Sequence, residues 1–193
     1  MDTVMDFGCG PGFFTEAFAA KAGRDVAVDA QPAMLKKARK RLGPAAARVE
    51  FVATRDGTEL AVLPASVDLA FLAYVYHEVE DPVRVLSELA RTLRPRGRLV
   101  IMERTEPARG PFNPPLIDPQ SVEQEAGSAG FALRNRIPWS RSTLLVFEKS
   151  PASGQRPPHG LEPARAVAPR PRRFESDGAP LAAIRQSRED LKP

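Results

Sequence analysis

The sequence of 193 residues has little cysteine and no long apolar run, and each shortage excludes a class of protein. A single cysteine, Cys9, excludes an intramolecular disulfide and a zinc site made of several cysteines. The best apolar run, residues 69–76, is as long as a strand and far short of the roughly 18 residues of a membrane-spanning helix. Residues 1–6 lack the basic and apolar stretches of a signal peptide. We therefore expect no membrane span and a cytoplasmic protein.

Hydrophobic residues, 42% of the chain, are enough for a packed core, but proline and charge are unevenly distributed. Eight of the 20 prolines follow Ser150. Residues 151–193 hold eight basic and five acidic side chains, so they carry +3 of the net charge of +4. The basic balance therefore belongs mostly to this tail and does not indicate a groove for nucleic acid. We predict one domain over residues 1–149 and a Pro/Arg-rich disordered tail over residues 150–193.

Short apolar segments alternate with amphipathic segments through the predicted domain. This alternation is typical of an α/β fold with a doubly wound, mostly parallel sheet and right-handed crossovers. The last two predicted strands are joined by a connection too short for a parallel return, so they must form an antiparallel hairpin. The predicted strands are residues 4–7, 25–29, 49–52, 68–76, 98–103, 131–137 and 143–148, and the clearest helix starts are Pro32, Pro82 and Pro119.

A glycine-rich turn follows the first predicted strand. Asp6 precedes Gly8, Gly10 and Gly12, and this glycine spacing differs from the G-x-G-x-x-G pattern of dinucleotide-binding proteins. Such a turn lets the backbone approach a ligand closely and directs helix N–H groups toward it. Asp29 ends the second strand, where a carboxylate can accept hydrogen bonds from the two hydroxyls of a ribose. The turn and Asp29 together predict a ligand that contains a nucleoside.

The segments that carry these features resemble class I S-adenosylmethionine-dependent methyltransferases. The resemblance is clearest over residues 4–15, 26–42, 66–72 and 93–99, and more thinly covers residues 2–149. Tyr76-His77-Glu78 after the fourth strand resembles the small ubiquinone/menaquinone-biosynthesis type. The resemblance implies a Rossmann-like sheet of seven strands in the order 3-2-1-4-5-7-6, which agrees with the predicted hairpin.

The resemblance also implies roles for individual residues. Asp6, Gly8, Gly10 and Gly12 would surround the methionine half of S-adenosylmethionine, and Asp29 would hold its ribose. Gln31 or Met34 would border the adenine, and Asp56 is the candidate acceptor for the adenine amino group. No metal is implied, because a sulfonium methyl leaves a neutral thioether. Such enzymes normally carry one or two helices before the first strand, and we expect these to be absent here or replaced by another covering element.

His77 is the candidate catalytic residue, because it follows the fourth strand at the edge where ligands bind in this architecture. An imidazole there could take a proton from the methyl acceptor, or could simply border the pocket. We expect His77, Glu78 and the proline-rich loop of residues 105–119 to line the acceptor pocket.

Three readings of the function remain at this point. We expect a methyltransferase that acts on a small-molecule acceptor, with no nucleic acid as partner. The alternative is a cofactor-binding protein, weakly active or truncated, that works with a partner. A nicotinamide-dependent oxidoreductase is disfavoured by the glycine spacing.

Overall fold

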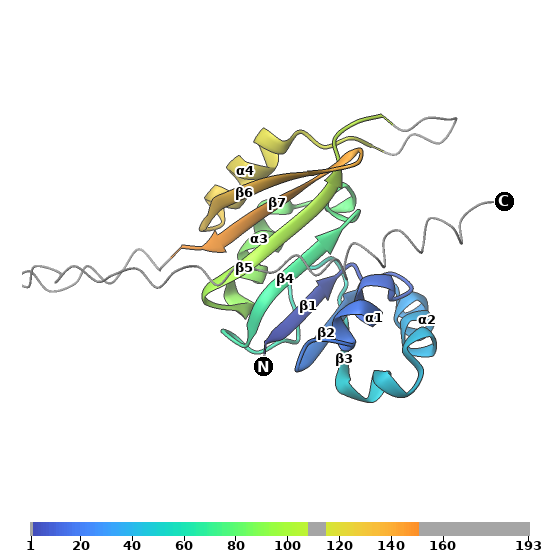
Figure 1. Ribbon diagram of the computed structural model, residues 1–193. Coiled ribbons are helices and arrows are strands. Elements are labelled where there is room, and N and C mark those ends of the chain that lie inside the picture. The colour runs from blue at the N-terminus through green and yellow to red at the C-terminus, as the bar shows by residue number, and fades with distance from the viewer. Residues whose placement is uncertain (1, 108–114, 151–193) are drawn as a thin grey trace, which may run out of the picture. The chain divides into compact units, whose positions relative to one another are not determined.

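The computed structural model describes residues 2–107 and 115–150 of the chain. Across these ranges, helices and strands alternate as the sequence predicts (Figure 1). The elements are β1 (Thr3–Phe7), α1 (Phe13–Ala19), β2 (Arg24–Asp29), α2 (Pro32–Leu42), the 3-10 helix η1 (Gly43–Arg48), β3 (Val49–Ala53), β4 (Val67–Ala73), the 3-10 helix η2 (Tyr76–Glu78), α3 (Pro82–Thr92), β5 (Leu93–Arg104), α4 (Pro119–Ser128), β6 (Phe131–Trp139) and β7 (Ser142–Lys149). Residues 151–193 of the predicted tail and residues 108–114 of the predicted loop lie outside the described part. None of the described helices is long and apolar enough to cross a membrane.

The strands form one seven-stranded sheet with the predicted order β3-β2-β1-β4-β5-β7-β6. The first five strands pair in parallel, whereas β7 runs antiparallel to both β5 and β6. The fold class predicted from the sequence is therefore confirmed. Because the chain crosses from β3 back to the far side of β1, the ends of β1 and β4 lie side by side.

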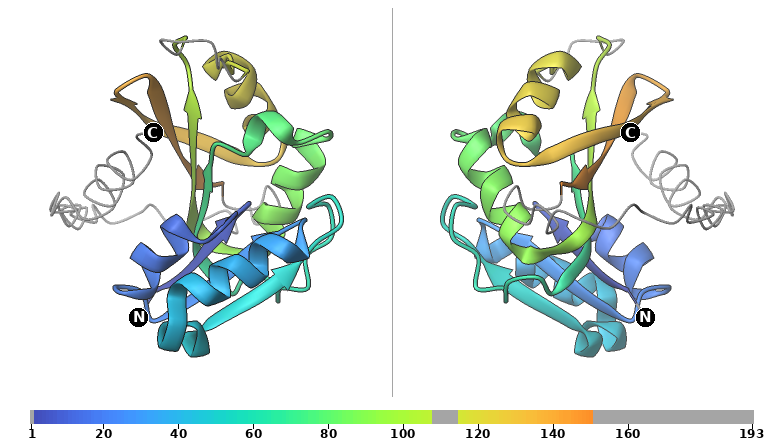
Figure 2. Two further views of the ribbon diagram at one scale, coloured as in Figure 1. Left: turned by 90° about the vertical axis from the view of Figure 1, so that its right-hand side faces the viewer. Right: turned by 90° about the vertical axis from the view of Figure 1, so that its left-hand side faces the viewer.

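The helices cover both faces of the sheet. Val26 and Val28 of β2 join the core that contains α3 and α4, whereas Ala27 between them joins the core that contains α1 and α2. Successive side chains of a strand point to opposite faces, so the two cores lie on opposite sides of the sheet. Figure 2 shows α1 on one side and both α3 and α4 on the other.

Two predicted helix starts are capped as the sequence suggests. Asp81 accepts a hydrogen bond from the amide of Arg84 at 3.1 Å, and Pro82 occupies the first helical turn of α3. Asp118 accepts from the amides of Gln120 and Ser121 at 3.1 and 3.2 Å before α4. Each carboxylate supplies an acceptor for N–H groups that have no partner within the helix.

Two predicted strand boundaries were wrong. The fourth strand was predicted to run to Tyr76, but β4 ends at Ala73 because Tyr74 has a φ of 56° and turns the chain into η2. The fifth strand was predicted from Arg98, but β5 begins at Leu93, directly after α3, because Leu93 pairs with Val67 of β4. The first correction matters for the site, because it places residues 76–78 on a short helical turn.

Candidate functional site

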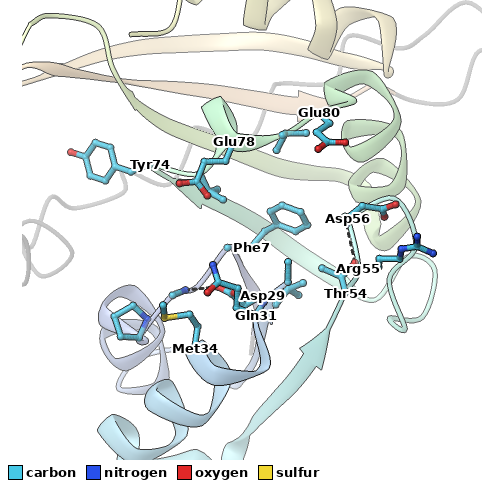
Figure 3. Close-up of a pocket in the computed structure, with 18 residues that line it drawn as sticks. Phe7, Asp29, Gln31, Met34, Thr54, Arg55, Asp56, Tyr74, Glu78 and Glu80 are labelled. Atoms are coloured by element: carbon cyan, nitrogen blue, oxygen red, sulfur yellow. Dashed lines mark hydrogen bonds between the residues drawn. The ribbon is translucent and has the colours of Figure 1, made fainter. Parts of the chain in front are cut away.

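A pocket of about 620 Å³ opens at the carboxyl ends of β1, β2 and β4 (Figure 3). In a parallel sheet this edge, at the point where the strand order reverses, is where ligands bind. The glycine turn forms one wall, the start of α2 and the segment after β3 form two more, and the segment after β4 closes the opposite side. The lining side chains used below are Phe7, Asp29, Gln31, Met34, Thr54, Arg55, Asp56, Tyr74, Glu78 and Glu80.

Asp29, the predicted ribose ligand, lies at the end of β2 in the pocket wall. Its Oδ2 accepts a hydrogen bond from the Gly10 amide at 2.8 Å, and its Oδ1 accepts from the Gln31 amide, also at 2.8 Å. The carboxylate thus joins the glycine turn to the start of α2. Each oxygen keeps a further lone pair that can accept a ligand hydroxyl.

The three predicted glycines have different surroundings. Gly12, with φ of 89°, lies so close to α2 that a Cβ would meet the Ala38 Cα at 2.9 Å. A Cβ on Gly10 would instead meet nothing within 4 Å, and Gly10 lines the pocket together with Gly8. Gly12 is absent from the described lining residues, so it serves the close packing of the turn against α2. Gly10, in contrast, leaves space in the pocket that a ligand could fill.

Asp6 lies behind the glycine turn. It is 3% exposed, its Oδ2 accepts a hydrogen bond from the Thr15 hydroxyl at 2.6 Å, and it is absent from the described lining of the pocket. Burial raises the pKa of Asp6 to about 7, although the bonds to Thr15 oppose this rise. Burial also raises the pKa of the Cys9 thiol. The structure therefore brings Asp6 near the turn but directs its carboxylate toward α1.

Asp56, the predicted adenine acceptor, lines the pocket from the segment after β3. Its Oδ1 accepts hydrogen bonds from the amide and the hydroxyl of Thr58 at 2.9 and 2.8 Å, and these bonds lower its pKa. Thr54 stabilises the same segment, because its hydroxyl accepts from the Gly57 amide at 2.9 Å. Asp56 is thus ionised at the rim, with its second oxygen available to a donor.

The wall after β4 is acidic. Figure 3 shows Glu78 and Glu80 on the side of the pocket opposite Asp29. The ring of Tyr74 points away from these three carboxylates. Tyr74 is held there by a hydrogen bond of 3.1 Å between its hydroxyl and that of Ser142 on β7. In the described lining, four carboxylates (Asp29, Asp56, Glu78 and Glu80) accompany one cationic side chain, Arg55. The pocket therefore favours a ligand that carries positive charge.

His77, the predicted catalytic residue, sits on η2 beside this wall, and the described lining of the pocket does not include it. Its Nδ1 lies 3.1 Å from both carboxylate oxygens of Glu103, at the end of β5. Its Nε2 lies 3.9 Å from Oε1 of Glu78, which does line the pocket. The structure thus places His77 at the border between the pocket and β5, with its ring paired to a buried carboxylate.

Sequence reasoning missed Glu103, Glu80 and the left-handed backbone of Tyr74. Glu103 carries a usable signal, because an acidic residue at the carboxyl end of an apolar strand lies at the edge where ligands bind. Glu80 lies two residues beyond the predicted Glu78, in the segment that follows η2, and its nearness to Glu78 in the sequence is the signal that could have indicated it. Tyr74 has no such signal, since a positive φ at an aromatic residue is not indicated by its type.

Comparisons with known proteins agree with this geometry. A methyltransferase domain family matches residues 5–101. The chain is 36% identical over 106 residues to a demethylmenaquinone methyltransferase of Clavibacter sepedonicus, a match that covers 55% of this chain and 42% of the relative. It is 31% identical over 98 residues to a ubiquinone biosynthesis O-methyltransferase of Xylella fastidiosa, covering 51% and 40%. The matched region thus spans less than half the length of either relative.

A solved structure supports the fold independently. The crystal structure of a SAM-dependent methyltransferase from Aquifex aeolicus superposes with a TM-score of 0.69 at 23% identity, covering 76% of this chain and 81% of that one. At this identity the likeness concerns the fold alone. The family match, in contrast, covers half of the chain and includes the glycine turn, Asp29 and η2. This chain therefore belongs to the methyltransferase domain family.

Proposed function

We propose that this protein is an S-adenosylmethionine-dependent methyltransferase with a small-molecule acceptor. The observation that carries the proposal is the arrangement of Asp29 beside the open face of Gly10. There the backbone can approach a ligand without a side chain in the way, and the Gly10 amide fixes a carboxylate beside that space. The residues present therefore fit this cofactor, and family membership supports the same assignment.

The charge of the pocket supports S-adenosylmethionine over a phosphorylated cofactor. S-adenosylmethionine carries a sulfonium and an ammonium group against one carboxylate, so it is a net cation. A nicotinamide dinucleotide carries a diphosphate, which the rim of Asp29, Asp56, Glu78 and Glu80 would repel. The same rim disfavours a nucleic-acid acceptor, whose backbone is a polyanion.

We propose cofactor contacts that combine the roles implied by the family resemblance with the residues that line the pocket. Gly8 and Gly10 border the methionine half and Asp29 accepts from the ribose hydroxyls, while Gln31, Met34 and Asp56 lie around the adenine. Asp6 and Gly12 support the turn from behind and from α2, without a direct contact.

The bound cofactor would supply a methyl group on sulfur whose departure leaves a neutral thioether, so the protein mainly has to orient the acceptor and exclude water. We propose that Nε2 of His77 accepts the proton that the acceptor loses. The names of the two relatives support an acceptor related to quinones, and the second relative, an O-methyltransferase, supports an oxygen atom as the methylated position.

Methyl transfer from labelled S-adenosylmethionine to a panel of acceptors tests this proposal. The panel contains demethylmenaquinone and simple phenols, and the parent is compared with His77→Ala and His77→Gln. Glutamine keeps a polar group of similar reach but cannot take up a proton. We expect both variants to lose roughly 10²- to 10⁴-fold in turnover, the usual contribution of a general base.

Binding separates the possible roles of His77. Affinity for S-adenosylhomocysteine, measured by calorimetry, should be the same in the parent and in both variants. Full activity of His77→Gln would show that His77 only shapes the pocket. A loss of binding equal to the loss of turnover would place His77 in the cofactor site. Binding without methyl transfer to any acceptor in the parent would favour the alternative, a cofactor-binding protein of weak activity.

A further inference from the structure

We propose that Glu103 is the positioning residue of His77: it fixes the imidazole with its proton on Nδ1 and so keeps Nε2 free to act as the base. This inference rests on the proposed function and adds to it a residue that was not among those predicted from the sequence. It is carried by the geometry between η2 and the carboxyl end of β5.

Glu103 is buried, with 1% of its surface exposed, and three donors converge on it. Its Oε1 accepts hydrogen bonds from the Tyr76 amide at 2.7 Å and from the His77 amide at 3.4 Å. The His77 ring completes the set through Nδ1, 3.1 Å from each oxygen. A buried carboxylate is stable only when its oxygens are hydrogen-bonded, so this cluster is the environment that Glu103 requires.

The contact determines which ring nitrogen carries the proton. Two backbone amides already donate to Glu103, so in this proposal its carboxyl group acts as an acceptor and the ring nitrogen that faces it donates. Nδ1 therefore holds the proton in the neutral ring, and Nε2 has a free lone pair. The Nε2 atom points toward Glu78, 3.9 Å away at the wall of the pocket, and the His77 side chain is 16% exposed. The basic nitrogen thus faces the side on which an acceptor would lie.

This arrangement accounts for every proton in the transfer. The acceptor X–H gives its proton to Nε2 while the X–CH₃ bond forms and the S–CH₃ bond breaks. The Nδ1 proton stays on the ring throughout. Glu103 stabilises the imidazolium that results, as a carboxylate does behind other catalytic imidazoles.

Glu103→Gln tests the positioning role directly. The Tyr76 amide requires an acceptor, which orients the new carbonyl toward it, and the amide NH₂ then faces Nδ1. The NH₂ group opposes a proton on Nδ1 and can donate to its lone pair, so we expect the proton to move to Nε2. Nitrogen-15 NMR of the imidazoles in the full chain reports this change. The sequence has two histidines, and His159→Gln assigns their signals.

We expect His77 to be protonated on Nδ1 in the parent and on Nε2 in Glu103→Gln. The matched control is Glu78→Gln, which changes the other carboxylate near the ring and should leave the proton on Nδ1. Affinity for S-adenosylhomocysteine should stay within about twofold in Glu103→Gln, whereas turnover should fall roughly 10²- to 10⁴-fold, as expected when a catalytic base is held in the wrong tautomer.

An Nε2-protonated ring in the parent, or an unchanged tautomer in Glu103→Gln, would overturn the positioning role. The NMR measurement needs neither cofactor nor acceptor, so its failure leaves the proposed function intact. Failure of the parent to bind S-adenosylhomocysteine would instead contradict the proposed function while the tautomer result stood.

Discussion

Asp29 and Gly10 are joined by a hydrogen bond of 2.8 Å from the Gly10 amide to Oδ2 of the carboxylate. The other oxygen of Asp29 accepts from the Gln31 amide at the same distance. One side chain at the end of β2 therefore holds two walls of the pocket in place. In the proposed function, the same carboxylate accepts hydrogen bonds from the ribose.

Asp29→Ala is expected to weaken binding of S-adenosylhomocysteine. The change removes the acceptor for the ribose hydroxyls and the hydrogen bond to the glycine turn. The binding free energy should therefore weaken by roughly 1–3 kcal/mol, which raises Kd roughly 5- to 150-fold. Calorimetry measures it. Asp29→Asn, which keeps one acceptor oxygen, should lose less. If Asp29→Ala binds as tightly as the parent, the ribose contact has been assigned to the wrong residue.

Alanine at Gly10 and at Gly12 should separate binding from stability. Both glycines have positive φ, so each change carries strain of roughly 1–2 kcal/mol. At Gly12 the new methyl also meets Ala38, which adds roughly 1–3 kcal/mol. Urea unfolding should therefore find Gly12→Ala the less stable variant, whereas Gly10→Ala, whose methyl enters the pocket, should lose more affinity for S-adenosylhomocysteine. Equal losses of stability would contradict this division.

Asp6 should make folding stability depend on pH. Burial raises its pKa from 3.8 to about 7, so between these values the folded protein keeps a proton that the unfolded chain releases. Stability conferred by the protonated form is complete below pH 3.8 and is lost as the pH rises toward about 7.

Asp6→Asn removes this ionisation while keeping an oxygen for the Thr15 hydroxyl. The free energy of unfolding of the variant, relative to the parent, should rise with pH by at most about 1.4 kcal/mol per unit and level off above the pKa of Asp6. Urea unfolding across this window measures the difference. The exposed control, Asp56→Asn, should show no such rise. A flat difference for Asp6→Asn would mean that Asp6 is ionised in the folded protein throughout.

Features that depend on residues close together in the sequence could be predicted from the sequence. The alternating strands and helices predicted the parallel sheet, the short connection predicted the hairpin, and the family resemblance implied the strand order. Asp29, Gly8, Gly10 and the walls at Gln31 and Met34 lie where a glycine turn and a strand end place them. These positions depend on the residues near them in sequence, which is why they were predictable.

The remaining features depend on tertiary contacts. His77 and Glu103 are 26 residues apart and meet only because β4 pairs with β5. The hydrogen bond from the Thr15 hydroxyl to Asp6 joins β1 to α1. Leu93 extends β5 because Val67 lies opposite it. None of these partners is indicated by residue type or spacing alone.

The central claim, that the pocket between Gly10, Asp29 and Glu78 binds S-adenosylmethionine, is tested most directly by calorimetry on the purified full chain. Three ligands are compared: S-adenosylmethionine, S-adenosylhomocysteine and NAD. We predict saturable binding of the first two, weakened by Asp29→Ala, and no binding of NAD. Binding of NAD without binding of S-adenosylmethionine or S-adenosylhomocysteine would contradict the account.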